Sequence, residues 1–131
     1  MNIQEGTGTI LLVDDESVVL EVGEQFLIHL GYTVFTAGTG AEAVEIVLQH
    51  AGNIDLLILD MAMPCMSGSE TFDEIKKIKA DMKILLMSGY NRNGEAQRIM
   101  DRGCNGFIRK PFSLEQLSHK IASILHENDS V

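Results

Sequence analysis

The hydrophobic positions fall into two patterns that alternate along the chain. Short runs, some apolar at every position and some mixed, occupy residues 10–13, 32–36, 56–59, 84–87 and 106–109. Runs of this length predict β-strands, and strands apolar at every position are typical of a parallel sheet covered on both faces. The mixed runs, 32–36 and 106–109, are expected to flank the sheet.

Between these runs, apolar residues recur every three or four positions, as they do on one face of a helix. Helices are predicted within residues 18–30, 44–48, 72–78 and 114–125, with a less apolar one over 94–102. Three capping boxes mark helix starts, because a Ser or Thr caps the first turn and a Glu or Gln three residues later reaches back. They are Thr39…Glu42, Ser67…Glu70 and Ser113…Gln116. The alternation predicts one α/β unit, βαβαβαβαβα, with right-handed crossovers.

Polar side chains follow the apolar runs at the points where the strands end. The first strand leads into Asp14 and Asp15, the third ends in Asp60, the fourth in Ser88, and the fifth leads to Lys110. In an open parallel sheet, ligands bind beyond the carboxyl ends of the strands. The pattern therefore predicts a functional site at this edge.

Gathered carboxylates repel one another, by about 4 kcal/mol for two charges 4 Å apart at an effective dielectric constant of 20. A raised pKa, the Lys110 ammonium or a bound cation can offset that repulsion. Oxygen ligands without His or Cys favour Mg²⁺, and a nearby ammonium and hydroxyl suit a phosphoryl group. The alternative is that Asp14, Asp15 and Asp60 only cap helices and loops.

Composition narrows the class of protein. The chain has 131 residues, 45% of them hydrophobic and 22% charged, which fits one globular domain. No apolar run approaches the roughly 20 residues of a membrane span, and the amino terminus lacks a signal-peptide core. The net charge of −9 argues against binding nucleic acid. Cys65 and Cys104 lack metal-ligand spacing and are expected to be reduced thiols in a cytoplasmic protein.

Four segments at the strand ends together resemble the receiver domains of two-component response regulators. They are Leu11-Leu12-Val13-Asp14-Asp15-Glu16, Asp60-Met61-Ala62-Met63-Pro64, Ser88-Gly89-Tyr90 and Phe107-Ile108-Arg109-Lys110-Pro111-Phe112. Each segment is a weak signal alone, but their order and placement are specific. The resemblance spans residues 9–125 and implies a flavodoxin-like fold, with a five-stranded parallel sheet in the order 2-1-3-4-5 and helices on both faces.

The resemblance also implies a role for each matching residue. Asp60 is expected to take a phosphoryl group from the phosphohistidine of a sensor histidine kinase or a histidine phosphotransfer domain. Asp14, Asp15, Asp60 and the backbone carbonyl of Ala62 are expected to hold Mg²⁺, and no organic cofactor is expected. Lys110 and Ser88 are expected to contact the phosphoryl oxygens. Ser88 and Phe107 are the expected switch residues, and Lys110-Pro111 matches a bond that is often cis in the family.

The switch is expected to act on the face formed by the fourth helix, the fifth strand and the fifth helix, with the 91–94 stretch following it. That face is also where phosphorylation-dependent self-association is expected. Ala62 and Tyr90 stand where the family tunes dephosphorylation, and neither carries a group that positions water. Autodephosphorylation is accordingly expected to be slow, and the domain is predicted to be a signalling module, not an enzyme.

Two other classes of protein compete with a working receiver. A phosphatase of the haloacid-dehalogenase type also forms an aspartyl phosphate, but it carries an Asp-x-Asp pattern on its first strand, where this chain has Asp14-Asp15. A degenerate receiver would act only as a docking surface. The expected organisation is an extension at 1–8, a receiver at 9–126 and a tail at 127–131, from a single-domain regulator or the receiver of a hybrid histidine kinase.

Overall fold

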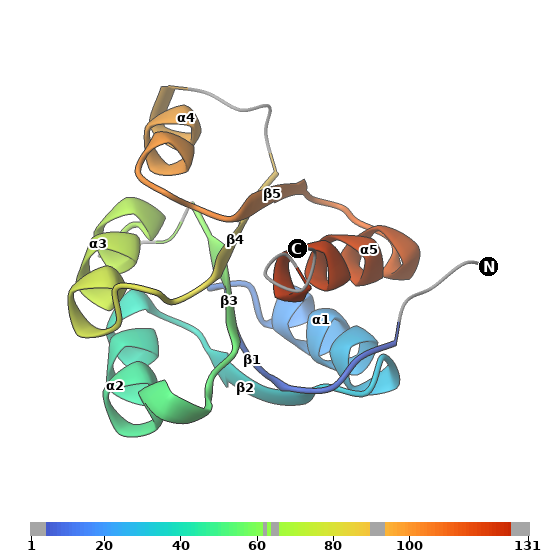
Figure 1. Cartoon of the computed structure of the whole chain (residues 1–131). Coiled ribbons are helices and arrows are strands. Elements are labelled where there is room, and N and C mark those ends of the chain that lie inside the picture. The colour runs from blue at the N-terminus through green and yellow to red at the C-terminus, as the bar shows by residue number, and fades with distance from the viewer. Residues whose placement is uncertain (1–4, 62, 64–65, 90–93, 127–131) are drawn as a thin grey trace.

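The computed structural model describes residues 5–61, 63, 66–89 and 94–126. Strands and helices alternate as the sequence predicts (Figure 1). The strands are β1 (Thr9–Val13), β2 (Thr33–Ala37), β3 (Leu56–Asp60), β4 (Ile84–Ser88) and β5 (Gly106–Arg109). The helices are α1 (Ser17–His29), α2 (Gly40–His50), α3 (Gly68–Ile78), α4 (Gly94–Asp101) and α5 (Leu114–Leu125), with a short 3₁₀ turn, η1 (Ala51–Asn53).

All neighbouring strands are parallel, in the order β2-β1-β3-β4-β5. The predicted fold class and strand order are confirmed. β3 and β4 lie inside the sheet, and every residue in them is buried. The flanking strands β2 and β5 contain half-buried and exposed residues, which explains their mixed composition.

Successive residues of each central strand face opposite sides of the sheet, and this alternation builds two cores. Leu11 and Val13 face the core under α2, α3 and α4, whereas Ile10 and Leu12 face the core under α1 and α5. Figure 1 shows α1 and α5 on one side of the sheet and α2 and α3 on the other. Because both faces are covered, the exposed ends of the strands are where the sheet can present polar groups.

The predicted capping boxes are formed at two of three helices. Ser67 and Glu70 cap α3 reciprocally, and Ser113 and Gln116 do the same for α5. At α2, the Thr39 hydroxyl accepts the Glu42 N–H at 3.0 Å, but the Glu42 carboxylate accepts the Gly38 N–H at 3.1 Å. The return bond of that box therefore goes one residue further upstream than predicted.

Residues before β1 pack onto the domain. The Gly6 N–H donates to the Leu30 carbonyl at 2.9 Å, and the Thr33 N–H donates to the Gly8 carbonyl at 2.8 Å. A Cβ atom added at Gly31, whose φ is +105°, would lie 2.4 Å from the Gly6 oxygen. Position 31 therefore requires glycine for two reasons, its positive φ and the close approach of the Gly6 carbonyl. The chain thus enters β1 along a defined path over the α1–β2 turn.

Candidate functional site

The predicted site residues meet at the carboxyl edge of the sheet. Asp60 ends β3, Ser88 ends β4, and Asp14 and Lys110 directly follow β1 and β5. The register fixes their positions, because the Asp14 N–H donates to Ala37 of β2 at 3.1 Å and the Lys110 N–H donates to the Ser88 carbonyl at 2.7 Å. Four strands far apart in sequence thus contribute to one site, as expected.

Three carboxylates form the acidic part of the site. One oxygen from each of Asp14, Asp15 and Asp60 lies within 4.8 Å of the other two. Asp14 and Asp60 are buried, with 0% and 2% of their surface exposed, whereas Asp15 is exposed. Asp14 also caps the following turn, because its Oδ1 accepts the Glu16 N–H at 2.9 Å. Capping is therefore one role of Asp14, but it does not account for the buried Asp60.

The Lys110 ammonium lies between the two buried carboxylates. Its Nζ is 2.9 Å from Asp14 Oδ2, 3.1 Å from Asp60 Oδ1 and 3.5 Å from Glu16 Oε1. Burial alone would lower the pKa of Lys110, but the hydrogen bond to Asp14 and the charges of Asp60 and Asp14 outweigh it and raise the pKa. The ammonium is consequently a fixed positive charge at neutral pH.

The pKa of Asp60 is shifted toward the neutral form of the side chain, whereas that of Lys110 is shifted toward the charged form. Burial of Asp60, and next the charge of Asp14, raise its pKa from 3.8 to about 6, although Lys110 lowers it. One ammonium therefore only partly offsets the acidic cluster. The repulsion predicted from the sequence is met in two of the predicted ways, by a raised pKa and by Lys110.

The donor set fits a hard divalent cation. Three carboxylates face one ammonium, no His or Cys of the described residues joins the group, and oxygen-only donors suit Mg²⁺. Asp14, Asp15 and Asp60 are the described residues that would hold such an ion. The carbonyl of Ala62, the fourth predicted ligand, lies outside the described residues. A bound cation would supply positive charge close to the Asp60 carboxylate.

Of the two predicted switch residues, Ser88 ends β4 and Phe107 lies within β5, where it pairs in register with Leu86. Ser88 is buried, with 8% of its surface exposed, and pairs in register with Arg109. Phe107 is half-buried and packs against the core under α2, α3 and α4. The Lys110–Pro111 peptide bond is cis. Tyr90, Cys65 and residues 91–93, which also entered the sequence predictions, lie outside the described residues.

Two features of the site were not predicted. Gly68 begins α3, and a Cβ there would lie 2.6 Å from the Asp60 carbonyl oxygen, so only glycine lets α3 approach the end of β3 this closely. Beside Lys110, Val18 and Val22 of α1 are 68% and 45% exposed and border a hollow of about 450 Å³ that Pro111 and Phe112 also line. The sequence does contain a sign of these exposed valines, because the apolar stripe of α1 is wider than one buried helix face requires.

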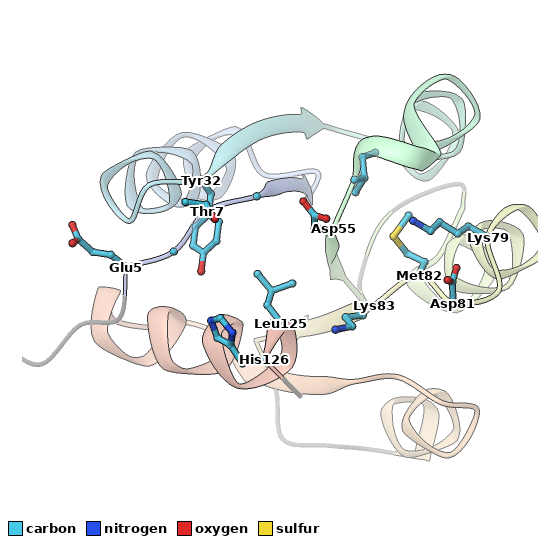
Figure 2. A pocket seen from close by; sticks show the side chains of 13 residues that line it. Glu5, Thr7, Tyr32, Asp55, Lys79, Asp81, Met82, Lys83, Leu125 and His126 are labelled. Carbon is cyan, nitrogen blue, oxygen red and sulfur yellow. The ribbon is translucent and has the colours of Figure 1, made fainter. Parts of the chain in front are cut away.

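A separate hollow of about 650 Å³ lies at the opposite, amino edge of the sheet. Figure 2 shows Tyr32, Lys83, Leu125 and His126 pointing into it. Burial raises the pKa of Tyr32, and Asp55 accepts the Thr9 N–H at 2.8 Å. The acidic cluster of the described residues lies at the other end of the strands, so this larger hollow is not the site predicted from the sequence.

The 2-1-3-4-5 parallel sheet, with an acidic cluster and a bridging lysine at its carboxyl edge, defines a flavodoxin-like α/β domain. The model of the response regulator receiver domain matches residues 10–122, and the chain belongs to that family. Receiver domains are the phosphoacceptor signalling modules of two-component systems, are generally not classed as enzymes, and bind Mg²⁺ at an acidic site.

Individual relatives agree with this assignment. The chain is 37% identical to sensor kinase CckA of Brucella abortus over 95% of its own length and 13% of the relative's. The receiver domain protein of Clostridium thermocellum has a TM-score of 0.87 and 32% identity, covering 93% of this chain and 97% of that one. Thermotoga maritima TrrA, solved with Mg²⁺ and BeF, has a TM-score of 0.78 and 35% identity, covering 90% and 99% of the two chains.

The chain spans only part of several curated relatives, from 13% of CckA to 45% of the probable transcriptional regulator ycf27 of Cyanidium caldarium. Among the described residues, no helix is long and apolar enough to cross a membrane. The family match favours the receiver over the haloacid-dehalogenase alternative, whose Asp-x-Asp pattern is absent from β1.

Proposed function

We propose that Asp60 is the phosphoacceptor of this receiver. The observation that carries the proposal is the buried Asp60 carboxylate at the end of β3, 3.1 Å from the Lys110 ammonium and grouped with Asp14 and Asp15. Asp60 attacks the phosphorus of a phosphohistidine, the P–N bond breaks, and the imidazole leaves with the bond's electron pair and takes up a proton. Lys110 and Ser88 bind the transferred oxygens. Asp14, Asp15, Asp60 and the Ala62 carbonyl would hold Mg²⁺, which would supply positive charge beside those oxygens.

Intact mass measures this assignment directly. With acetyl phosphate and Mg²⁺, the wild-type protein is expected to gain one phosphoryl group and Asp60→Asn none. Asp55→Asn is the matched control, because Asp55 is an exposed acid one strand-length away, at the other end of β3. A phosphoryl group retained by Asp60→Asn, or none gained by the wild type, would refute the proposal; the second result would describe a degenerate receiver.

Magnesium binding is tested separately. Calorimetric titration of the unphosphorylated protein is expected to show weak Mg²⁺ binding that Asp15→Ala abolishes, because a divalent ion relieves the repulsion between the three carboxylates. An unchanged affinity in Asp15→Ala would place the ion elsewhere.

The histidine-bearing donor is proposed to dock over the exposed valines of α1. Val18 and Val22 lie beside Lys110 and Phe112, around the hollow next to the site, so a partner helix resting there would hold its histidine near Asp60. Val22→Glu is expected to slow transfer from a histidine-phosphorylated protein and to leave labelling by acetyl phosphate unchanged. Ile28→Glu, a 53% exposed residue at the far end of α1, is the control. Equal slowing with both donors would mean that the substitution damages the site itself.

The remaining proposals concern context. The receiver domain comprises residues 9–126 and acts in the cytoplasm. It is either a single-domain regulator or part of a hybrid kinase. It does not bind nucleic acid, and its phosphoryl group is lost slowly by autodephosphorylation. Phosphorylation acts through Ser88 and Phe107 on the α4-β5-α5 face, through which the phosphorylated chain self-associates.

A further inference from the structure

The outer surface between α2 and α3 carries a groove that the phosphoryl chemistry does not use. Both helices cover the same face of the sheet (Figure 1), and a hollow of about 490 Å³ lies between them. Ala41 and Val44 of α2 form one wall, and Met66, ahead of α3, adds an apolar side chain. The other wall belongs to α3 and is polar.

The α2 wall is apolar and extends from the core into solvent: Val44 packs partly against the core, whereas Ala41 is exposed. Ala43 and Val47 are fully buried and already supply the core-facing side of this helix. Ala41, Val44 and Leu48, spaced by three and four positions, form a second apolar stripe, in which Leu48 is 64% exposed and Val44 half-buried. A helix that is apolar on two sides is typical of one covered on both.

The α3 wall is acidic along the same length. Glu70, Asp73 and Glu74 line the groove, with Lys77 as the one cation among its lining residues. Lys77 is 3.1 Å from Glu74 in an exposed pair, with side chains 72% and 47% exposed, and such exposed pairs contribute little to stability. Asp73 likewise forms an exposed pair with Arg102, at 3.4 Å. With Lys77 and Arg102 counted, the wall carries one net negative charge, and both exposed pairs can be replaced at little cost by cations of a partner.

We infer that the groove binds a basic amphipathic helix of a protein partner. Its apolar residues pack on Ala41 and Val44, which line the groove, and on Leu48, an exposed residue that continues the same stripe along α2. Its Lys or Arg residues face Glu70, Asp73 and Glu74. The 11 residues of α2 extend about 16 Å, which matches roughly three turns of a docked helix. Charge selects the partner: the acidic wall and the net charge of −9 repel nucleic acid, anionic lipid and a second copy of this chain.

A designed peptide tests the groove without knowledge of the natural partner. The probe is a 14-residue amphipathic helix of Leu and Lys, titrated into the unphosphorylated ¹⁵N-labelled chain. Amide shifts are expected along α2 and α3. A scrambled peptide of the same composition, which forms no apolar face, is expected to bind at least tenfold more weakly. Equal binding by the scrambled peptide, or shifts confined to other acidic surfaces, would overturn the inference.

One substitution separates apolar docking from charge attraction. Leu48→Glu adds a negative charge, so general attraction to the cationic probe would strengthen binding, whereas loss of the apolar contact weakens it at least tenfold. Leu48 is exposed, so the fold is expected to survive, and thermal unfolding checks this. Ile28→Glu adds the same charge on α1 and is expected to leave affinity within twofold. Unchanged or tighter binding by Leu48→Glu would refute the groove. Phosphorylation of Asp60 is not involved, so this test and that of the phosphoacceptor fail independently.

Discussion

Replacing Asp60 with Asn is expected to stabilise the metal-free protein at neutral pH. Burial and the charge of Asp14 raise the pKa of Asp60 from 3.8 to about 6, so the folded chain binds this proton more tightly than the unfolded chain does. Stability from this group is therefore complete below pH 3.8 and is lost as pH rises through 6. Asn keeps the shape of the neutral carboxyl group and removes the loss.

The magnitude follows from the pKa difference. Raising the pKa from 3.8 to about 6 corresponds to about 3 kcal/mol at pH 8, and to about 2 kcal/mol at pH 5.5, where part of Asp60 is protonated in the folded chain. The influence of Lys110 is already included in this pKa. Because the Asp60 side chain is 2% exposed, solvent screening reduces the figure little.

Urea unfolding followed by circular dichroism, with EDTA present, measures the effect. Asp60→Asn is expected to exceed the wild type by up to about 3 kcal/mol at pH 8, and the difference should narrow as pH falls. Asp81→Asn, on an exposed loop, is the control and should change stability by less than about 0.5 kcal/mol. Saturating Mg²⁺ should reduce the advantage, because it stabilises the wild type by binding. A mutant no more stable than the wild type at pH 8, or an advantage independent of pH, would refute the reasoning.

Three further predictions concern the same edge of the sheet and its surroundings. Lys110→Met should lower metal-free stability at pH 7.5 by about 1–3 kcal/mol, because the carboxylates around Lys110 then lack their ammonium. Mg²⁺ should restore more stability to this variant than it adds to the wild type. Equal urea midpoints for the two proteins would contradict this prediction. Gly68→Ala should cost about 1–3 kcal/mol and shift the amide signals of β3 and α3, because its Cβ overlaps the Asp60 carbonyl; a neutral change would mean that α3 moves freely. Beryllofluoride with Mg²⁺ should shift the amide signals of Phe107 and α4 and, in Ser88→Ala, shift them less; changes confined to the acidic cluster would separate the site from that face.

Much of the fold follows from the apolar pattern, because central strands buried on both faces leave uninterrupted runs such as Leu56 to Leu59. The strand order does not follow from that pattern, which says nothing of neighbours; it came from the resemblance. The site could be predicted because Asp60 ends its strand, Lys110 directly follows another, and parallel strands end at one edge.

Close contacts between backbone atoms and side chains could not be predicted from the sequence. Gly68 looks like an ordinary helix start, and only the distance from its position to the Asp60 carbonyl shows that a methyl group does not fit. The second capping bond at α2 was also predicted with the wrong partner. The Glu42 carboxylate accepts the N–H of Gly38, not that of Thr39. Periodicity places a side chain on a face of a helix, but it does not say which of two faces packs against the protein, and so the exposure of Val18 and Leu48 was missed.

The site joins parts of the chain that are made at very different times during synthesis. Lys110 and Asp14, 2.9 Å apart, are separated by 96 residues. Contacts of such long range form only when the intervening chain has been ordered, and domains generally fold as units once synthesised. A chain that stops before β5, or in which β5 has not docked, has its acids but lacks the ammonium between them. With the role proposed for Lys110, the ability to accept a phosphoryl group would therefore depend on completion of the fold.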